Sequence, residues 1–275
     1  MARLAELRAR VANIRDLDEV VGAMRALAAV RMRQALDAVR ASRRCAAAIA
    51  GALASARSLV PGESPPLAGG TGLVVVFCTE HGFAGAFNDH LIDRASDRPR
   101  RPLIVVGSRG AALAAERGLE VVASFAAASH PSGVIDVARR VSSELYTRID
   151  RDGLERADAI YGHGDAIGPP TIVCERLLPV ECAAHATSAA CPPLHHLEPR
   201  TLVQRLMAEF VLADLIRMAM ESLVAENSAR MQTMSAAKDN IERKLVQLEQ
   251  AEHRGRQDQV TTELLDLITG AEALR

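Results

Sequence analysis

The sequence predicts an α/β protein in which two long helices, one at each end of the chain, form an antiparallel coiled coil, with a Rossmann-like α/β domain inserted between them. Residues 1–58 and 198–275 carry apolar side chains at helical spacing over far more residues than a globular helix ordinarily uses. From residue 73, short apolar runs of strand length alternate with helical stretches. We therefore divide the chain into an N-terminal coiled-coil helix (1–58), a Rossmann-like α/β domain (70–190) and a C-terminal coiled-coil helix (198–275).

The first helix is predicted from a narrow apolar stripe. Its members recur every three or four residues: Leu4, Leu7, Val11, Ile14, Leu17, Val21, Met24 and Leu27. A stripe of this width is typical of a helix that pairs with another helix. Residues 1–58 hold eleven arginines against five acidic residues. The prolines and glycines that follow, between 61 and 72, predict the end of this helix.

The middle of the chain has the rhythm of a parallel sheet covered by helices. Strands are expected at 73–77, 103–106 and 121–125, with helices near 87–96, 108–117 and 133–149. Two further strand candidates are 158–161 and 171–179. A segment rich in Ala, Ser, His and Pro, 182–199, links the sheet to the last helix.

The last helix begins at Pro199, which suits a first turn, and it meets no proline or glycine between Arg200 and Ala251. Charged residues, among them Glu221, Glu226 and Arg230, are expected on the faces away from the stripe. Residues 199–275 hold ten basic and twelve acidic side chains, so favourable pairing with the arginine-rich first helix is expected. The stripe itself comprises Leu202, Leu206, Phe210, Leu215, Met218, Leu223, Met231, Met234, Ile241, Leu245 and Leu248.

Composition excludes several classes of function. A formal net charge of −1 gives no general attraction to nucleic acid. No apolar run approaches the length of a membrane span, and the charged first ten residues do not resemble a signal peptide. Five scattered cysteines indicate reduced thiols in a cytosolic compartment.

Two glycine-containing loops are expected to be plain turns. Gly162, Gly164 and Gly168 superficially match a dinucleotide loop, but two prolines follow directly and leave no helix N-terminus for a pyrophosphate. The loop from Thr79 to Asn88 joins a strand to a helix and matches no phosphate-binding fingerprint. We expect no bound cofactor.

Other candidate motifs are weak. Cys182, His185, Cys191 and His195 could bind zinc, but their spacing fits no common structural site, so a polar linker is expected and a zinc-stabilised adaptor remains the alternative. Ser235 and Lys238 have the spacing of a nucleophile motif with no third partner. No acid/base pair or triad stands out, and no catalytic residue is predicted. The arginine cluster Arg40, Arg43 and Arg44 is interpreted as a solvated helix face, with binding of an acidic protein as the alternative.

Several segments resemble the gamma subunits of F-type ATP synthases. The resemblance covers both ends of the chain and the sheet between them, and its carboxyl-terminal motif is the most specific. It rests on Ala23–Arg33, Glu221–Met231, Ala236–Asn240 and Arg256–Leu274, with shorter matches at Leu177–Pro179 and Glu198–Pro199.

This resemblance implies a non-catalytic rotor that carries torque between the membrane c ring and the catalytic alpha/beta ring. It implies alpha, beta, epsilon and c subunits as partners, and coupling of proton or sodium transport to ATP synthesis or hydrolysis. The expected location is peripheral, on the cytoplasmic face of the bacterial inner membrane, with membrane contact only through the complex.

The resemblance also implies contacts with beta subunits. Arg256, Gln257, Thr261 and Glu263 match positions that bind a beta-subunit loop in the family. Met24 and Arg25 match a region close to an acidic segment of the beta subunits. A place for Met24 within the coiled-coil seam is the alternative.

The chain departs from the family pattern at Glu80–Asn88, which lacks a cysteine and one glycine of that pattern. This departure indicates a divergent subgroup of the family. Whether that subgroup is the sodium-linked type is left open.

The competing hypothesis is a stand-alone α/β ligand-binding protein that dimerises through its long helices.

Overall fold

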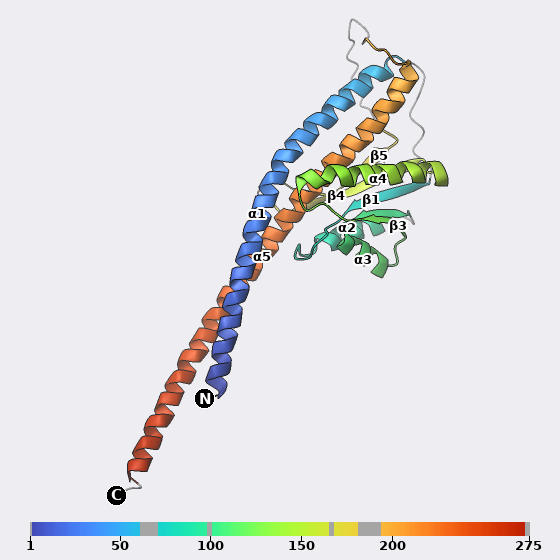
Figure 1. Cartoon of the computed structure of the whole chain (residues 1–275). Helices are drawn as coiled ribbons and strands as arrows, with labels where there is room; N and C mark the ends of the chain where they lie inside the picture. The colour runs from blue at the N-terminus through green and yellow to red at the C-terminus, as the bar shows by residue number, and fades with distance from the viewer. Residues whose placement is uncertain (1, 61–70, 98–100, 165–167, 181–193, 273–275) are drawn as a thin grey trace. The chain divides into compact units, whose positions relative to one another are not determined.

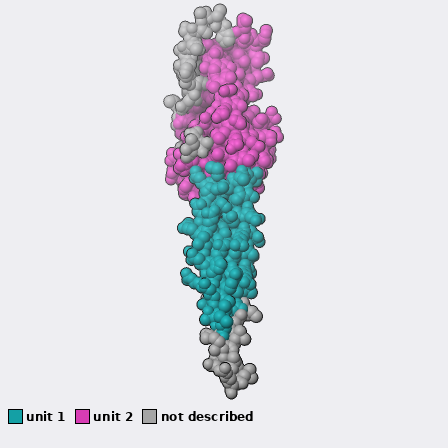
Figure 2. Space-filling view, turned by 90° about the vertical axis from the view of Figure 1, so that its left-hand side faces the viewer, with its two compact units in different colours: residues 1–27, 231–275 teal, residues 28–230 magenta. Residues whose placement is uncertain are grey.

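A computed structural model describes residues 2–60, 71–97, 101–164, 168–180 and 194–272, without the side chains of 2–3, 262–263 and 265–272. The chain divides into two compact units (Figure 2), one made of residues 1–27 and 231–275 and the other of residues 28–230. Helix α1 (Ala2–Arg57, 56 residues) and helix α5 (Pro199–Glu272, 74 residues) each contribute to both units (Figure 1). Among the described helices, none combines the length and apolarity that a membrane crossing requires.

In the first unit, the two helices pair in antiparallel orientation. Val21 of α1 packs against Met234 and Ile241 of α5, and partly buried residues flank this cluster. Ion pairs join the flanks, as expected from the opposite charge balance: Arg8–Glu252, Arg15–Glu249 and Asp18–Lys238.

The predicted stripe on α1 is wrong at two positions. Leu17 and Leu27 are about half exposed. The seam passes instead through Asp18, which binds Lys238, and through buried Ala28 in the second unit. The buried positions of α1 recur with a heptad-like spacing. This spacing places Asp18 in the seam, whereas the apolar pattern alone favoured the neighbouring Leu17.

The second unit contains a five-stranded sheet in the order β3-β2-β1-β4-β5. Its first four strands are parallel, as expected, and β5, for which no direction was predicted, runs antiparallel to β4. The strands are β1 (Gly72–Phe77), β2 (Leu103–Val106), β3 (Val121–Phe125), β4 (Arg156–His163) and β5 (Thr171–Leu178).

Helices cover both faces of this sheet. Helices α2 (Phe87–Ser96) and α3 (Ser108–Glu116) cover one face, where Val74, Val76 and Val105 are buried. Helix α4 (Pro131–Asp152) and α5 cover the other, together with Leu53 and Ala56 of α1. The alternation of short apolar runs with helical stretches therefore gave the correct layers.

Helix α5 is buried on all faces over one stretch, contrary to the expectation of a narrow stripe. From Met220 to Arg230 every residue is buried, including Glu221, Glu226 and Arg230. A helix that is buried all round has neighbours on every side. Here α1, the sheet and the loop after β1 supply them.

Candidate functional site

Helix α5 crosses the sheet at the carboxyl ends of β1 and β4. The Ser222 hydroxyl donates to the carbonyl oxygen of Phe77, the last residue of β1, at 3.0 Å. Gly162, near the end of β4, donates its backbone N–H to the same hydroxyl at 3.4 Å. In doubly wound sheets, the point where the strand order reverses is the usual place for a nucleotide or other ligand. In this chain, that point lies between β1 and β4, and α5 occupies it.

Gly162 makes this crossing possible. A Cβ atom there would lie 2.5 Å from the ring of Phe87 and 2.7 Å from the Cβ of Ala225. The prediction of a plain turn at Gly162 was wrong, because this residue pairs with Ile172 inside the ladder between β4 and β5. Its glycine is explained by the close approach of α5 rather than by phosphate binding.

The loop from Thr79 to Asn88 is held by its own contacts and by α5. The Asn88 side chain accepts from the Thr79 backbone N–H and donates to the Thr79 hydroxyl. Arg230 of α5 donates to the carbonyl oxygens of His81 and Gly82. The loop from Thr79 to Asn88 therefore contacts α5 and is bound to it through Arg230.

A buried ion pair lies beside this loop. Arg230 donates to Glu226 at 2.6 Å, and both side chains are close to fully buried. Burial raises the pKa of Glu226 above its ordinary value, although Arg230 opposes the shift. The Arg230 guanidinium is therefore the main hydrogen-bond partner of the Glu226 carboxylate, which has little access to water.

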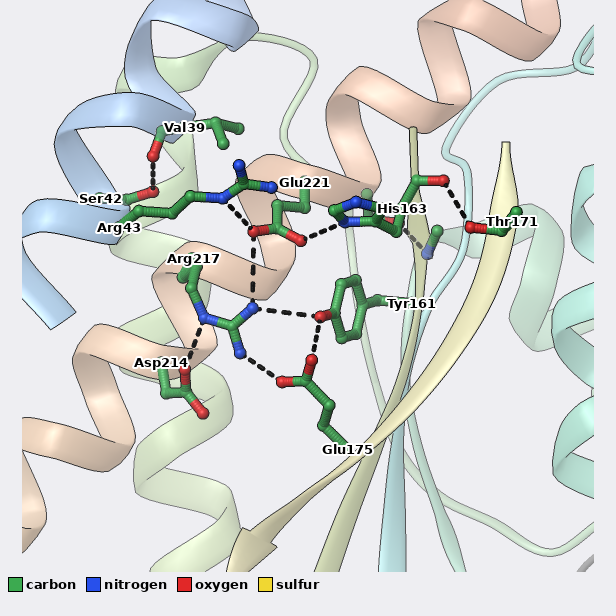
Figure 3. A network of polar contacts seen from close by, with 12 residues as sticks. Val39, Ser42, Arg43, Tyr161, His163, Thr171, Glu175, Asp214, Arg217 and Glu221 are labelled. Carbon is green, nitrogen blue, oxygen red and sulfur yellow. Dashed lines mark hydrogen bonds and ion pairs between the residues drawn. The ribbon is translucent and has the colours of Figure 1, made fainter. Parts of the chain in front are cut away.

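A second polar network joins α1, the sheet and α5 (Figure 3). Its centre is Glu221, whose side chain is 4% exposed. This carboxylate accepts from Arg43 Nε of α1 at 2.8 Å, from His163 Nδ1 of β4 at 2.8 Å, and from Arg217 of α5 at 3.5 Å. Burial alone would raise the pKa of Glu221, but the hydrogen bonds from Arg43 and His163 and the charge of Arg217 lower it.

Arg217 extends the network to the edge of the sheet. It donates to the Tyr161 hydroxyl at 3.1 Å and to Glu175 of β5, and Tyr161 in turn donates to Glu175 at 2.7 Å. The Nε atom of Arg217 donates to the Asp214 carboxylate at 2.7 Å. Burial raises the pKa of Asp214 despite this ion pair. A cavity of about 540 Å³ opens beside the network and is bounded on the α1 side by Arg43 and three alanines.

The structure corrects the interpretation of the arginine cluster on α1. Arg43 is not simply solvated, because it binds buried Glu221. Arg40 fits the expectation, since its side chain is 76% exposed and pairs with nearby Asp37 on the same helix. Arg44 is exposed.

The residues predicted to contact beta subunits lie in the first unit. Met24 is partly buried against the seam formed by Val21, Met234 and Ile241, as its alternative reading proposed, while Arg25 is exposed. Arg256 is exposed and pairs with Glu252 one turn away. Thr261 donates to the backbone of exposed Gln257. Glu263 belongs to α5, and its side chain lies outside the described residues.

The structure describes the remaining candidate motifs only in part. Cys182, His185 and Cys191 lie outside the described residues, and His195 is exposed with its Nδ1 2.9 Å from the Leu197 carbonyl oxygen. Within the described part of the chain, no group of side chains could hold a metal ion. Lys238 of the candidate nucleophile motif, Ser235 and Lys238, forms an ion pair with Asp18.

Long terminal helices flank the sheet, and one of them fills the sheet's ligand crevice; solved chains from ATP synthase central stalks and rotors have this fold. A chain of the Euglena gracilis mitochondrial ATP synthase, solved with OSCP, F1 and the c-ring, has this fold, with a TM-score of 0.71 at 13% identity, covering 99% of this chain and 95% of that one. A Tetrahymena thermophila central stalk/c-ring chain has a TM-score of 0.57 at 16% identity, covering 79% and 99% of the two chains.

Sequence comparison gives the family. The family model described as ATP synthase matches residues 3–274. The ATP synthase gamma chains of Methylobacterium nodulans and Phenylobacterium zucineum are each 28% identical to this chain, over the full length of both partners. The chain belongs to the ATP synthase gamma-chain family, whose members are non-catalytic subunits of the central stalk.

Proposed function

We propose that this chain carries torque between a membrane c ring and a catalytic ring of alpha and beta subunits, coupling proton or sodium transport to ATP synthesis or hydrolysis. One observation carries the proposal. Helix α5 is a single helix that is fixed to the sheet at Glu221–Arg230 and continues without a break to Glu272. A continuous helix is stiff along its length, as a rotor requires.

The end of α5 offers a surface for other subunits. The pairing with α1 reaches Leu4, whose Cδ1 lies 3.7 Å from the position that a Cβ on Gly255 would take. Beyond Gly255, α5 continues for about 25 Å at the rise of a helix. Val260 and Leu264 are half exposed there, next to exposed Gln257 and Thr261. Apolar and hydrogen-bonding side chains on one side of a helix suit a protein interface.

We assign beta-subunit contacts to Arg256, Gln257, Thr261 and Glu263 on α5 and to Arg25, with Met24, on α1. Within the described residues, Arg25 has no ion-pair partner and Arg256 pairs with Glu252 one turn away. Both guanidinium groups are therefore available to an acidic segment of another subunit.

The fold also suggests a division of labour. We propose that the domain at 70–190 serves as the foot, near epsilon and the c ring, and that 1–58 and 198–275 form the shaft. The chain would then be a peripheral protein at the cytoplasmic face of a bacterial inner membrane, held there by the complex.

Replacing Arg256 and Gln257 by alanine tests the beta contact in the reconstituted complex. We expect at least a fivefold loss of coupled ATPase turnover or of assembled complex, because both side chains are exposed and the proposed contact would lose its cation and its amide together. Arg139→Ala is the matched control, since Arg139 is a similarly exposed arginine with one local carboxylate.

Equal behaviour of the double variant and the Arg139→Ala control would refute the assigned contact. Failure of the unmodified tagged chain to bring down alpha and beta subunits under gentle conditions would refute the rotor function itself.

A further inference from the structure

We propose that Glu221 and Arg43 form a polar joint that fixes α1 to α5 and to the sheet, and that both are positioning residues for torque transfer. The inference rests on the proposed rotor function and extends it to a part of the chain far in sequence from the assigned beta contacts. It concerns only the second unit, where all the residues involved lie.

Glu221 is suited to this task because three elements converge on one buried carboxylate. Arg43 comes from α1, His163 from β4, and Arg217 from the preceding turn of α5 (Figure 3). Through Arg217 the same network reaches Glu175 of β5. A displacement of α1 along α5 would therefore stretch hydrogen bonds that are tied to the sheet.

The contact between α1 and α5 at Arg43 is polar because the apolar packing of α1 is interrupted there. On either side of the joint α1 packs through apolar residues, with Ala35 and Val39 towards one side and Leu53 and Ala56 towards the other. Between these regions, Ala46, Ala47 and Ala50 border the 540 Å³ cavity and are too short to fill it. Arg43 spans this region with its long side chain.

This cavity is better explained as part of the joint than as a ligand site. Glu221, Arg217 and Tyr161, the polar groups at its base, already have protein partners. A ligand that bound these groups would have to displace those contacts, which include the ion pair between Arg43 and Glu221.

A polar joint resists sliding in a way that apolar packing does not. The hydrophobic effect is non-directional, so two smooth apolar surfaces can shift with little change in buried area. A hydrogen bond weakens steeply as its angle departs from linearity. Loss of Arg43 would also leave buried Glu221 with one donor fewer.

The test is the number of ions pumped per ATP hydrolysed by the reconstituted complex that contains Arg43→Gln. We expect this ratio to fall at least threefold while ATP hydrolysis changes less than twofold, because the catalytic ring is untouched and only the transmission loosens. Arg40→Gln, on the same helix with a local partner only, should leave the ratio unchanged. A ratio in Arg43→Gln equal to that of Arg40→Gln would overturn the joint while leaving the rotor function intact.

A rescue variant separates positioning from a general loss of stability. Arg43→Lys keeps a cation that can donate to Glu221 and should retain at least half of the ratio lost in Arg43→Gln. Arg43→Met, which keeps the length of the side chain without a donor, is the control and should behave like Arg43→Gln. If Arg43→Gln does not assemble, Arg43→Lys and Arg43→Met are compared directly, and equal assembly and pumping by both would overturn the proposal.

Discussion

Two polar stretches of the same helix have opposite environments. Glu221, Glu226 and Arg230 are buried, and Glu221 and Arg230 bind groups elsewhere in the second unit. Arg256, Gln257 and Thr261 are exposed, and the Arg256 and Thr261 side chains bind partners one turn away on the same helix. The residue types alone do not distinguish the two stretches.

The difference shows what polar residues on a long helix can be for. In the buried stretch they satisfy one another and leave little capacity for a partner protein. In the exposed stretch, Arg256 and Thr261 contribute little to the fold, which fits the contacts with other subunits that we propose for them. Three predictions sharpen this contrast.

The largest expected effect is at Arg230. Arg230→Met should lower the free energy of unfolding by about 3 kcal/mol, because it leaves Glu226 buried without its main cationic partner. Denaturant unfolding of the purified full-length chain measures this. A loss below about 1 kcal/mol would mean that the buried pair contributes no more than a surface pair.

A smaller effect is expected at Glu221 and Glu226 of the buried stretch. Their contributions to the free energy of unfolding should depend on pH with opposite signs. The lowered pKa of Glu221 gives a stabilising contribution that is present above about pH 4.5 and is lost as pH falls through the lowered value. The raised pKa of Glu226 gives a contribution that is present below about pH 4.5 and is lost as pH rises through the raised value.

Relative to the unmodified chain, Glu221→Gln should therefore lose stability as pH rises, and Glu226→Gln should gain it. Unfolding curves from about pH 2.5 to about pH 8 provide the comparison, with the Glu221→Gln difference developing below about pH 4.5 and the Glu226→Gln difference above it. Slopes of the same sign for both variants would contradict the assigned environments.

The smallest effect is expected at Arg256, the exposed counterpart of Arg230. Arg256→Met should change the free energy of unfolding by no more than about 0.5 kcal/mol, since an exposed pair one turn apart contributes little. The same denaturant measurement applies. A loss comparable to that of Arg230→Met would remove the distinction between the two stretches.

Periodicity was sufficient to predict most of the fold. The helices at both ends and all five strands lie close to where the spacing of apolar residues placed them, because those spacings reflect which face of each element is buried. The direction of β5 was not predicted, since an apolar run carries no information about which neighbour it pairs with.

The candidate site was predicted less completely, for a physical reason. Glu221 looked like a surface residue because helical spacing gives only its position relative to its own stripe. Its burial arises from elements far away in sequence, including Arg43, 178 residues earlier, and His163, 58 residues earlier. A polar-rich stretch inside a helix that otherwise carries a steady apolar stripe was the available signal. Arg256 and its neighbours were identified through family resemblance alone.

The missing side chain at Gly162 has a consequence for ligand binding. It lets Ala225 of α5 come close to the strand at the point where related sheets hold nucleotides. A nucleotide could bind at that point only by displacing α5, and with it the hydrogen bond from the Ser222 hydroxyl to the carbonyl oxygen of Phe77.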